Sequence, residues 1–237
     1  MIRYFRSLLG QSGLFVACAT ALAATLAAPA AFAQSAAPAA ATGAATGAKS
    51  VETKAAMCIG CHGIPGYQAT FPEIHRVPMI SGQNAKYIVA ALNAYKNGDR
   101  KHPTMRGIGA GMSEQDMVEV ADWYAKQGKP AAADKPSREP SPQVAALLQK
   151  AACTSCHGVN FSKATDPAYP KLAGQHADYL FVALKSYKNE PNNVVGRSNG
   201  VMGGIAKQFT NAELKALAQY VGSLEGEMQV KPQSRFR

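Results

Sequence analysis

Two short segments of the sequence place a pair of cysteines and a histidine at the same spacing. These Cys-x-x-Cys-His motifs consist of Cys58, Cys61 and His62, and of Cys153, Cys156 and His157. Two thiols three residues apart on a tight helical turn can react with both vinyl groups of one porphyrin, and the next residue can then put its imidazole on the iron. The spacing therefore predicts two covalently bound haem c groups, with His62 and His157 as iron ligands.

Other uses of paired cysteines fit this sequence less well. A redox-active disulfide also uses Cys-x-x-Cys, but normally on a βαβ pattern that this chain lacks. Structural zinc could be bound by the four cysteines and two histidines, yet a full domain separates the two motifs. Ordinary disulfides of an exported protein would not require the histidine that follows each pair.

A sixth ligand would decide what each iron can do. An open face binds small molecules, whereas a thioether closes the iron and raises its reduction potential. Met105 and Met202 are the only methionines in register between the two segments, and each lies eight residues before a hydroxyl residue that begins a predicted helix. We therefore predict that Met105 and Met202 are axial ligands opposite His62 and His157.

Other candidate ligands lack a ligating counterpart. Met112 corresponds to Phe209, and His102 corresponds to Asn199, so His102 is expected in an exposed loop. Neither of the other two histidines, His75 and His176, has a matched partner. We expect the following methionines to be packing residues: Met57, Met79, Met117 and Met228.

Two prolines occupy matched positions after the histidines. Pro78 follows His62 by 16 residues, and Pro170 follows His157 by 13. An axial imidazole needs its second N–H held in place, and proline offers a carbonyl on a stiff backbone without a competing N–H. We expect both carbonyls to accept that hydrogen; ordinary turn prolines are the alternative.

The motifs belong to two segments that repeat each other. Further matches follow in the same order: Pro78 to Gln83 with Pro170 to Gln175, Tyr87 with Tyr179, Tyr95 with Tyr187, and Trp123 with Tyr220. We call residues 51–127 the first copy and residues 143–226 the second copy. Residues 128–142 contain four prolines and predict a stiff linker, and residues 227–237 are a C-terminal tail.

The periodicity within each copy is helical. The stretches around Tyr87–Tyr95 and Tyr179–Tyr187 each gather apolar residues on one face. Short helices should lead into each cysteine pair, over Val51–Met57 and Val144–Ala151. Two further helices should begin at capping boxes, which are Ser113 with Asp116 and Thr210 with Glu213. We predict an all-α fold of two tandem domains, each a small helical bundle around one haem.

The N-terminal residues are typical of an export signal. Residues 1–33 have a basic start, an apolar stretch and the cleavage-site pattern Ala31-Phe32-Ala33, so we expect a signal peptide and a periplasmic location. A retained membrane anchor is the alternative. Residues 34–50 are small and polar, which predicts a flexible tether. Residues 1–33 contain two arginines and no acid, so the formal charge of +10 falls to +8 after cleavage.

These motifs resemble the class I cytochrome c fold, and the duplication resembles bacterial cytochrome c4. The resemblance covers about residues 51–226 and includes a Pro-x-Leu-x-Gly element, present as Pro170, Leu172 and Gly174, and as Pro78, Ile80 and Gly82. It implies His/Met-ligated haems and two domains that face each other across a pseudo-twofold interface. It also implies a shuttle from a quinol-oxidising complex or dehydrogenase to a terminal oxidase. The first copy departs from the pattern by an insertion over residues 71–76, and the second by five extra residues before Met202.

Three functions are compatible with these features. The leading hypothesis is an electron carrier without a catalytic site; the alternatives are a dihaem peroxidase-like enzyme and a dedicated cytochrome subunit of a dehydrogenase. Peripheral membrane contact is compatible with the charge, whereas nucleic acid is not an expected partner, because an exported chain without a basic aromatic platform does not suit it. Basic residues could steer docking to an acidic partner, or could simply be a solvated surface: Lys86, Lys96, Arg100, Lys101, Arg106, Lys185, Lys188 and Arg197.

Overall fold

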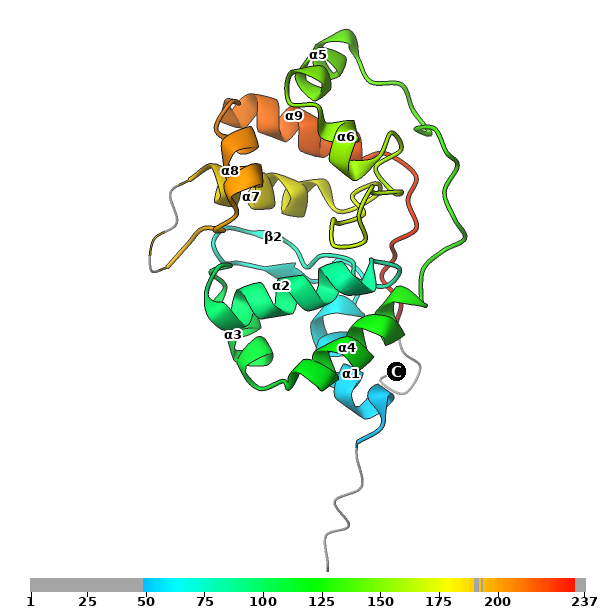
Figure 1. The fold of residues 1–237 in the computed structure, drawn as a ribbon, viewed down its shortest axis with the longest axis vertical. Coiled ribbons are helices and arrows are strands. Elements are labelled where there is room, and N and C mark those ends of the chain that lie inside the picture. The colour runs from blue at the N-terminus through cyan, green and yellow to red at the C-terminus, as the bar shows by residue number, and fades with distance from the viewer. Residues whose placement is uncertain (1–48, 190–191, 193, 233–237) are drawn as a thin grey trace, which may run out of the picture. The chain divides into compact units, whose positions relative to one another are not determined.

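The computed structural model describes residues 49–189, 192 and 194–232 (Figure 1). The predicted signal peptide and all but the last two residues of the predicted tether lie outside these residues. Everything described belongs to one compact unit, Gly47–Arg237. None of the described helices is long and apolar enough to cross a membrane.

The first copy is built from four helices. These are α1 (Val51–His62), α2 (Ala85–Asn97), α3 (Pro103–Ala110) and α4 (Glu114–Ala125). The predicted capping box begins α4, with Ser113 and Asp116 exchanging side-chain and backbone hydrogen bonds. The apolar faces of α2 and α4 meet in a core that contains Leu92, Met117 and Val120. A small hairpin of two-residue strands, β1 (Gln68–Ala69) with β2 (His75–Arg76), contains the insertion over residues 71–76.

The second copy repeats this arrangement with five helices. These are α5 (Pro142–Lys150), α6 (Cys153–His157), α7 (Ala177–Lys188), α8 (Gly200–Ala206) and α9 (Asn211–Gly222). The second predicted capping box, Thr210 with Glu213, begins α9. The faces of α7 and α9 form a separate core around Leu180, Leu214 and Leu217. The fold is all-α, as predicted, apart from the small hairpin.

The helix that carries the cysteine motif differs between the copies. In the first copy, α1 does not end near Met57 but continues through the whole motif to His62. In the second copy the helix is interrupted before the motif: α5 ends at Lys150, α6 begins at Cys153, and Ala152 between them adopts a left-handed conformation with φ of 46°. The Ser155 hydroxyl donates to the Ala152 carbonyl at 2.7 Å, which gives that carbonyl a partner outside a continuous helix. Glycine occupies the equivalent position 60, so the first copy has no such competitor.

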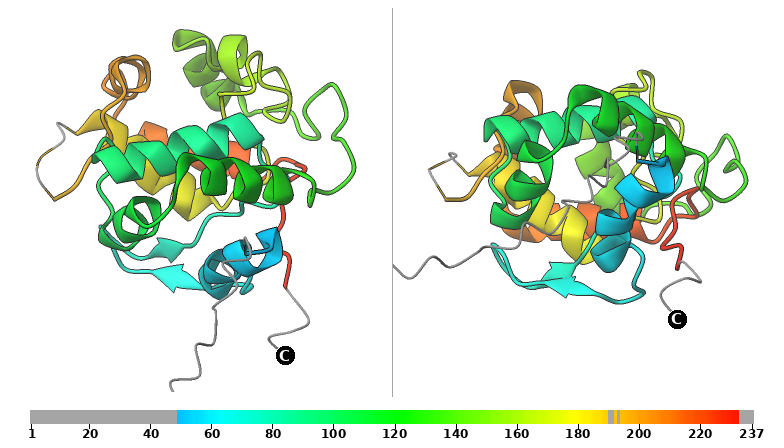
Figure 2. Two further views of the ribbon diagram at one scale, coloured as in Figure 1. Left: turned by 60° about the horizontal axis from the view of Figure 1, so that its bottom comes forward. Right: turned by 90° about the horizontal axis from the view of Figure 1, so that it is seen from below.

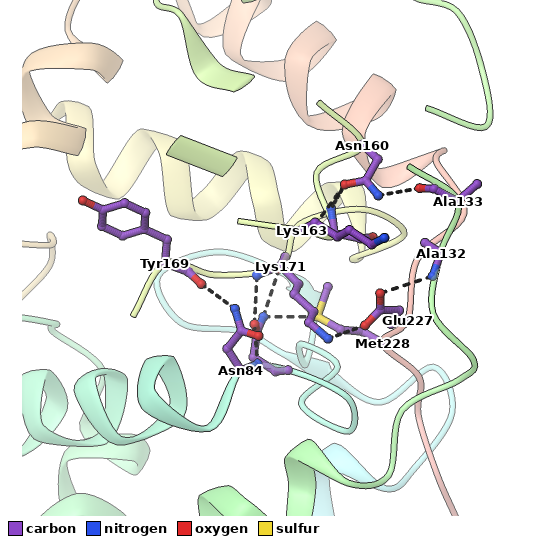
Figure 3. Close-up of polar contacts among 11 residues, drawn as sticks. Asn84, Ala132, Ala133, Asn160, Lys163, Tyr169, Lys171, Glu227 and Met228 are labelled. Carbon is purple, nitrogen blue, oxygen red and sulfur yellow. Dashed lines mark hydrogen bonds and ion pairs between the residues drawn. The ribbon is translucent and has the colours of Figure 1, made fainter. Parts of the chain in front are cut away.

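Segments outside the helices connect the copies. The linker runs along one side of the molecule, and the tail after α9 returns to the first copy (Figures 1 and 2). Gln229 of the tail forms an antiparallel bridge with Ser81. Glu227 pairs with Lys171 and accepts a hydrogen bond from the Ala132 backbone of the linker (Figure 3). The tail therefore joins both copies and the linker.

Candidate haem sites

A cavity of about 430 Å³ gathers the predicted site residues of the first copy. Its lining includes the Cys58, Cys61 and His62 motif from α1, together with Pro78 and Met105. The methionine comes from α3, on a different element from the motif. The fold therefore brings residues 47 positions apart in the sequence, Cys58 and Met105, to the wall of one cavity.

The second copy has an equivalent cavity of about 370 Å³. Its lining includes Cys153, Cys156 and His157, together with Pro170 and Met202 from α8. All four motif cysteines are free thiols, which argues against the disulfide alternative. Among the described residues, no three His, Cys, Asp or Glu side chains are grouped as the zinc alternative requires.

Each motif histidine contacts the carbonyl of the matched proline. Nδ1 of His62 lies 2.7 Å from the Pro78 oxygen, and Nδ1 of His157 lies 3.3 Å from the Pro170 oxygen. Burial lowers the pKa of both imidazoles, and the carbonyls oppose this shift only in part. A neutral ring whose Nδ1 donates its hydrogen keeps a lone pair on Nε2, which is the form that binds a metal.

The environment of the first cysteine in each motif disfavours its thiolate form. Burial, and then the charge of Cys61, raise the pKa of the Cys58 thiol to about 11. Burial also raises the pKa of Cys153. Reactive redox cysteines have lowered pKa values, so these thiols are poorly suited to a dithiol–disulfide cycle.

The helices that carry the two methionines begin with equivalent caps. Nδ1 of His102 accepts from the Met105 backbone N–H at 3.3 Å, and Oδ1 of Asn199 accepts from the Met202 N–H at 2.9 Å. His102 is therefore a half-buried helix cap at the wall of the first cavity, and the prediction of an exposed loop histidine was wrong. The matched Asn199, a good capping residue, was the signal in the sequence that a helix begins here.

The other unmatched ligand candidates have structural positions. His75 is buried at the first cavity, with its ring 6.0 Å from that of Tyr179, and His176 is the N-cap residue of α7. Met112 is buried in the core of the first copy. Of the four expected packing methionines, three are buried (Met79, Met117 and Met228), whereas Met57 is 54 % exposed beside the first cavity.

Two of the basic residues expected on the surface lie instead between the cavities. Arg100 and Arg197 form an antiparallel bridge, and both line both cavities. The Arg100 guanidinium donates to the hydroxyl groups of Tyr87 in its own copy, at 3.2 Å, and Tyr187 in the other, at 3.4 Å. Arg197 donates to Tyr179 at 3.3 Å. No carboxylate among the described residues forms an ion pair with either guanidinium.

Few of the remaining basic residues are both exposed and outside an ion pair. Lys96 pairs with Glu114, and Lys185 pairs with Glu73. Lys86 and Arg106 are the two exposed members of the predicted set, and the others are half-buried. Fewer of these cations are therefore free to steer docking to an acidic partner than the sequence suggested.

The second copy matches a family model. The model, described as cytochrome c, covers residues 142–225. These residues hold the second motif, Met202 and all five helices of that copy.

Relatives match both copies. Cytochrome c4 of Azotobacter vinelandii is 29% identical over 185 residues, which is 72% of this chain and 86% of the relative. The thiosulfate dehydrogenase electron acceptor of Stutzerimonas stutzeri is 29% identical over 183 residues, which is 72% of this chain and 80% of the relative.

A solved structure has the same fold. Cytochrome c4 of Acidithiobacillus ferrooxidans superposes with a TM-score of 0.54 at 26% identity, and the match covers 72% of this chain and 99% of that one. The matched part of this chain is longer than one copy, so the similarity includes the duplicated helical arrangement. The chain therefore belongs to the cytochrome c4 family, as a dihaem c-type cytochrome that binds haem c covalently and carries electrons.

Proposed function

We propose that each cavity holds one haem c, attached through both cysteines of the local motif. The proposed axial pairs are His62 with Met105 and His157 with Met202. One observation carries this proposal: each cavity is lined by a complete motif, a matched methionine and the proline whose carbonyl contacts the motif histidine.

The residues around the cavities suit such a group. Haem c supplies reversible one-electron chemistry when it is bound. The proline carbonyls would hold the imidazoles in the neutral form that leaves Nε2 free, and the thioethers would close the opposite faces. Arg100 and Arg197 supply two cations without carboxylate partners among the described residues, which suits the carboxylate groups of a porphyrin.

We further infer that the mature protein works in the periplasm, after cleavage of residues 1–33. Residues 51–127 and 143–226 would then be two haem domains joined by the linker 128–142. The proposed electron donors are a quinol-oxidising complex or a dehydrogenase, and the proposed acceptor is a terminal oxidase. The export-signal pattern and the carrier family support this assignment.

A dedicated role beside one dehydrogenase is the second candidate. The relative named as a thiosulfate dehydrogenase electron acceptor supports it. Purification of the protein from its native membranes and periplasm distinguishes the two: constant association with one larger dehydrogenase favours the dedicated subunit, and a free protein favours the shuttle. A peroxidase-like enzyme would need an iron with an open face, and a methionine is available at each cavity.

Absorption spectra of the reduced protein, with and without carbon monoxide, test the proposed coordination. We expect an alkaline pyridine assay to give two haems per chain and carbon monoxide to leave the spectrum unchanged. One haem per chain, or a carbon monoxide shift in half of the signal, would overturn the assignment of two closed His/Met sites.

A further inference from the structure

Two glutamines at equivalent positions reach across from one copy to the other. Gln83 and Gln175 each follow the glycine of the Pro-x-Ile/Leu-x-Gly element, and each is only 4 % exposed. Gln175 Oε1 accepts from the Met79 N–H at 3.0 Å, and its Nε2 donates to the Met79 oxygen at 2.9 Å. In the reciprocal contact, Gln83 bonds the N–H and the oxygen of Lys171, both at 2.9 Å.

These glutamines bind the peptide groups whose carbonyls contact the motif histidines His62 and His157. Met79 directly follows Pro78, so its N–H and the Pro78 carbonyl belong to one planar peptide group. That peptide group accepts from His62 on one side and donates to Gln175 on the other. It therefore completes a continuous chain of hydrogen bonds from the second copy to the imidazole of the first.

The reciprocal chain has the same construction. The peptide group between Pro170 and Lys171 contacts Nδ1 of His157 through its oxygen and donates its N–H to Gln83 Oε1. Lys171 lies beside Glu227 and Met228 of the tail (Figure 3). The two series of hydrogen bonds therefore cross. The glutamine of each copy is linked, through one peptide group, to the motif histidine of the other copy.

The C-terminal tail closes the space between the two glutamines. The Met228 sulfur lies 3.3 Å from Nε2 of Gln83 and 3.6 Å from Nε2 of Gln175, and its side chain is buried. Each Nε2 donates both to a backbone oxygen of the opposite copy and to this sulfur. The two amides are thus fixed in orientation by partners on every side.

We propose that Gln83 and Gln175 are crossed positioning residues, each of which tunes the haem iron held by the opposite copy. This proposal rests on the proposed ligands His62 and His157. Hydrogen bonds in a chain polarise one another, so an acceptor on the peptide N–H makes the peptide oxygen a better acceptor. A stronger bond to Nδ1 makes the imidazole more basic, which stabilises the ferric state and lowers the reduction potential.

The decisive variant is Gln175→Met, which keeps an unbranched side chain of similar volume and removes every hydrogen bond of the amide. It should raise the potential of the haem on Cys58 and Cys61, although Gln175 lies in the other copy. We expect the equilibrium constant for electron exchange between the two haems to change about tenfold, which corresponds to a change of about 59 mV in the difference between their reduction potentials. Gln83→Met should do the same to the haem on Cys153 and Cys156.

The measurement is a redox titration of the full-length dihaem protein, with the haem methyl NMR signals reporting each haem separately. Asn84→Ala is the matched control, because it removes a neutral contact between the copies, the hydrogen bond from Asn84 Nδ2 to the Tyr169 oxygen at 2.8 Å, and leaves the hydrogen bonds of both glutamine side chains to the opposite copy in place. It should leave both potentials unchanged.

A crossed pattern supports the proposal. If Gln175→Met retains two haems and the normal spectrum but leaves the first haem's potential unchanged, or shifts only the haem of its own copy, the proposal is wrong. A missing haem or an altered ligand spectrum in the unmodified protein would instead contradict the proposed coordination.

Gln175→Glu keeps the test available if the methionine variant does not fold. A neutral carboxylic acid can both donate to the Met79 oxygen and accept from its N–H, so the potential of the first haem should match that of the unmodified protein at low pH. Ionisation creates a stronger acceptor and adds a negative charge that acts on both haems, so both potentials should fall and that of the first haem should fall further. Equal behaviour of both haems, or no pH dependence in this variant beyond that of the unmodified protein, would overturn the proposal.

Discussion

Arg100 and Arg197 pair backbone to backbone between the two copies, and each side chain lines both cavities. Four tyrosines surround the pair, with the Arg100 guanidinium 5.2 Å from the Tyr87 ring centre and the Arg197 guanidinium 5.3 Å from the Tyr187 ring centre. Two like charges held together without a carboxylate partner among the described residues form a positive centre that belongs to both copies.

Replacing Arg197 with methionine should therefore lower the reduction potentials of both haems. A nearby cation favours the reduced state, and at an effective dielectric constant of about 20 its loss over roughly 10–15 Å is worth on the order of 1 kcal/mol. Potentiometric titration measures the effect. Lys86→Met, which removes an exposed cation, is the control and should cause a much smaller shift; a change confined to one haem would contradict a shared centre.

Removing either matched methionine should open one iron. Met202→Ala is expected to make half of the reduced haem signal respond to carbon monoxide, because nothing else at that position can supply a thioether. Met105→Ala should open the other half. Met112→Leu alters a buried methionine of the core and should leave the carbon monoxide response absent. An unchanged spectrum in Met202→Ala would eliminate that residue as a ligand.

The tail should contribute to stability through Glu227. Its side chain and that of Lys171 are only 12 % and 18 % exposed, and Glu227 also accepts from the Ala132 N–H of the linker. Glu227→Gln should reduce the free energy of unfolding by about 1–3 kcal/mol, because it leaves a largely buried ammonium group without its counter-charge. Urea unfolding of the holoprotein measures this change.

The pair of Lys163 and Asp134 is the matched comparison, since it also links the second copy to the linker but is mostly exposed. Asp134→Asn should cost less than about 1 kcal/mol. Equal losses from the two substitutions would show that burial of the Glu227 pair has no special effect.

Acid should destabilise the first copy through Asp116. The Lys54 ammonium group and the Ser113 hydroxyl and backbone lower the pKa of this carboxyl from 3.8 to about 2. Because the folded pKa lies below the unfolded one, the stabilisation is complete above about pH 4 and is lost as the pH falls towards 2. Unfolding measured across this range should show a shallower slope for Asp116→Asn. An identical slope would exclude a contribution from this carboxyl.

Local sequence patterns predicted much of the fold. The capping boxes at Ser113 and Thr210 depend on residues three positions apart, and the buried faces of α4 and α9 follow from helical periodicity. Haem chemistry was likewise readable from Cys-x-x-Cys-His, because the motif brings its reacting groups together within one turn. The pairing of those motifs with Met105 and Met202 remains a prediction, now supported by shared cavities.

What the sequence alone determined is therefore the chemistry within each copy, since its short spacings specify which groups can meet. Only the tertiary structure decided how the copies act on each other. Arg100 and Arg197 are indistinguishable in sequence from surface cations, and Gln83 and Gln175 contact residues 88 and 96 positions away. Contacts of that separation depend on how two folded surfaces fit together, and no local periodicity or motif carries that information.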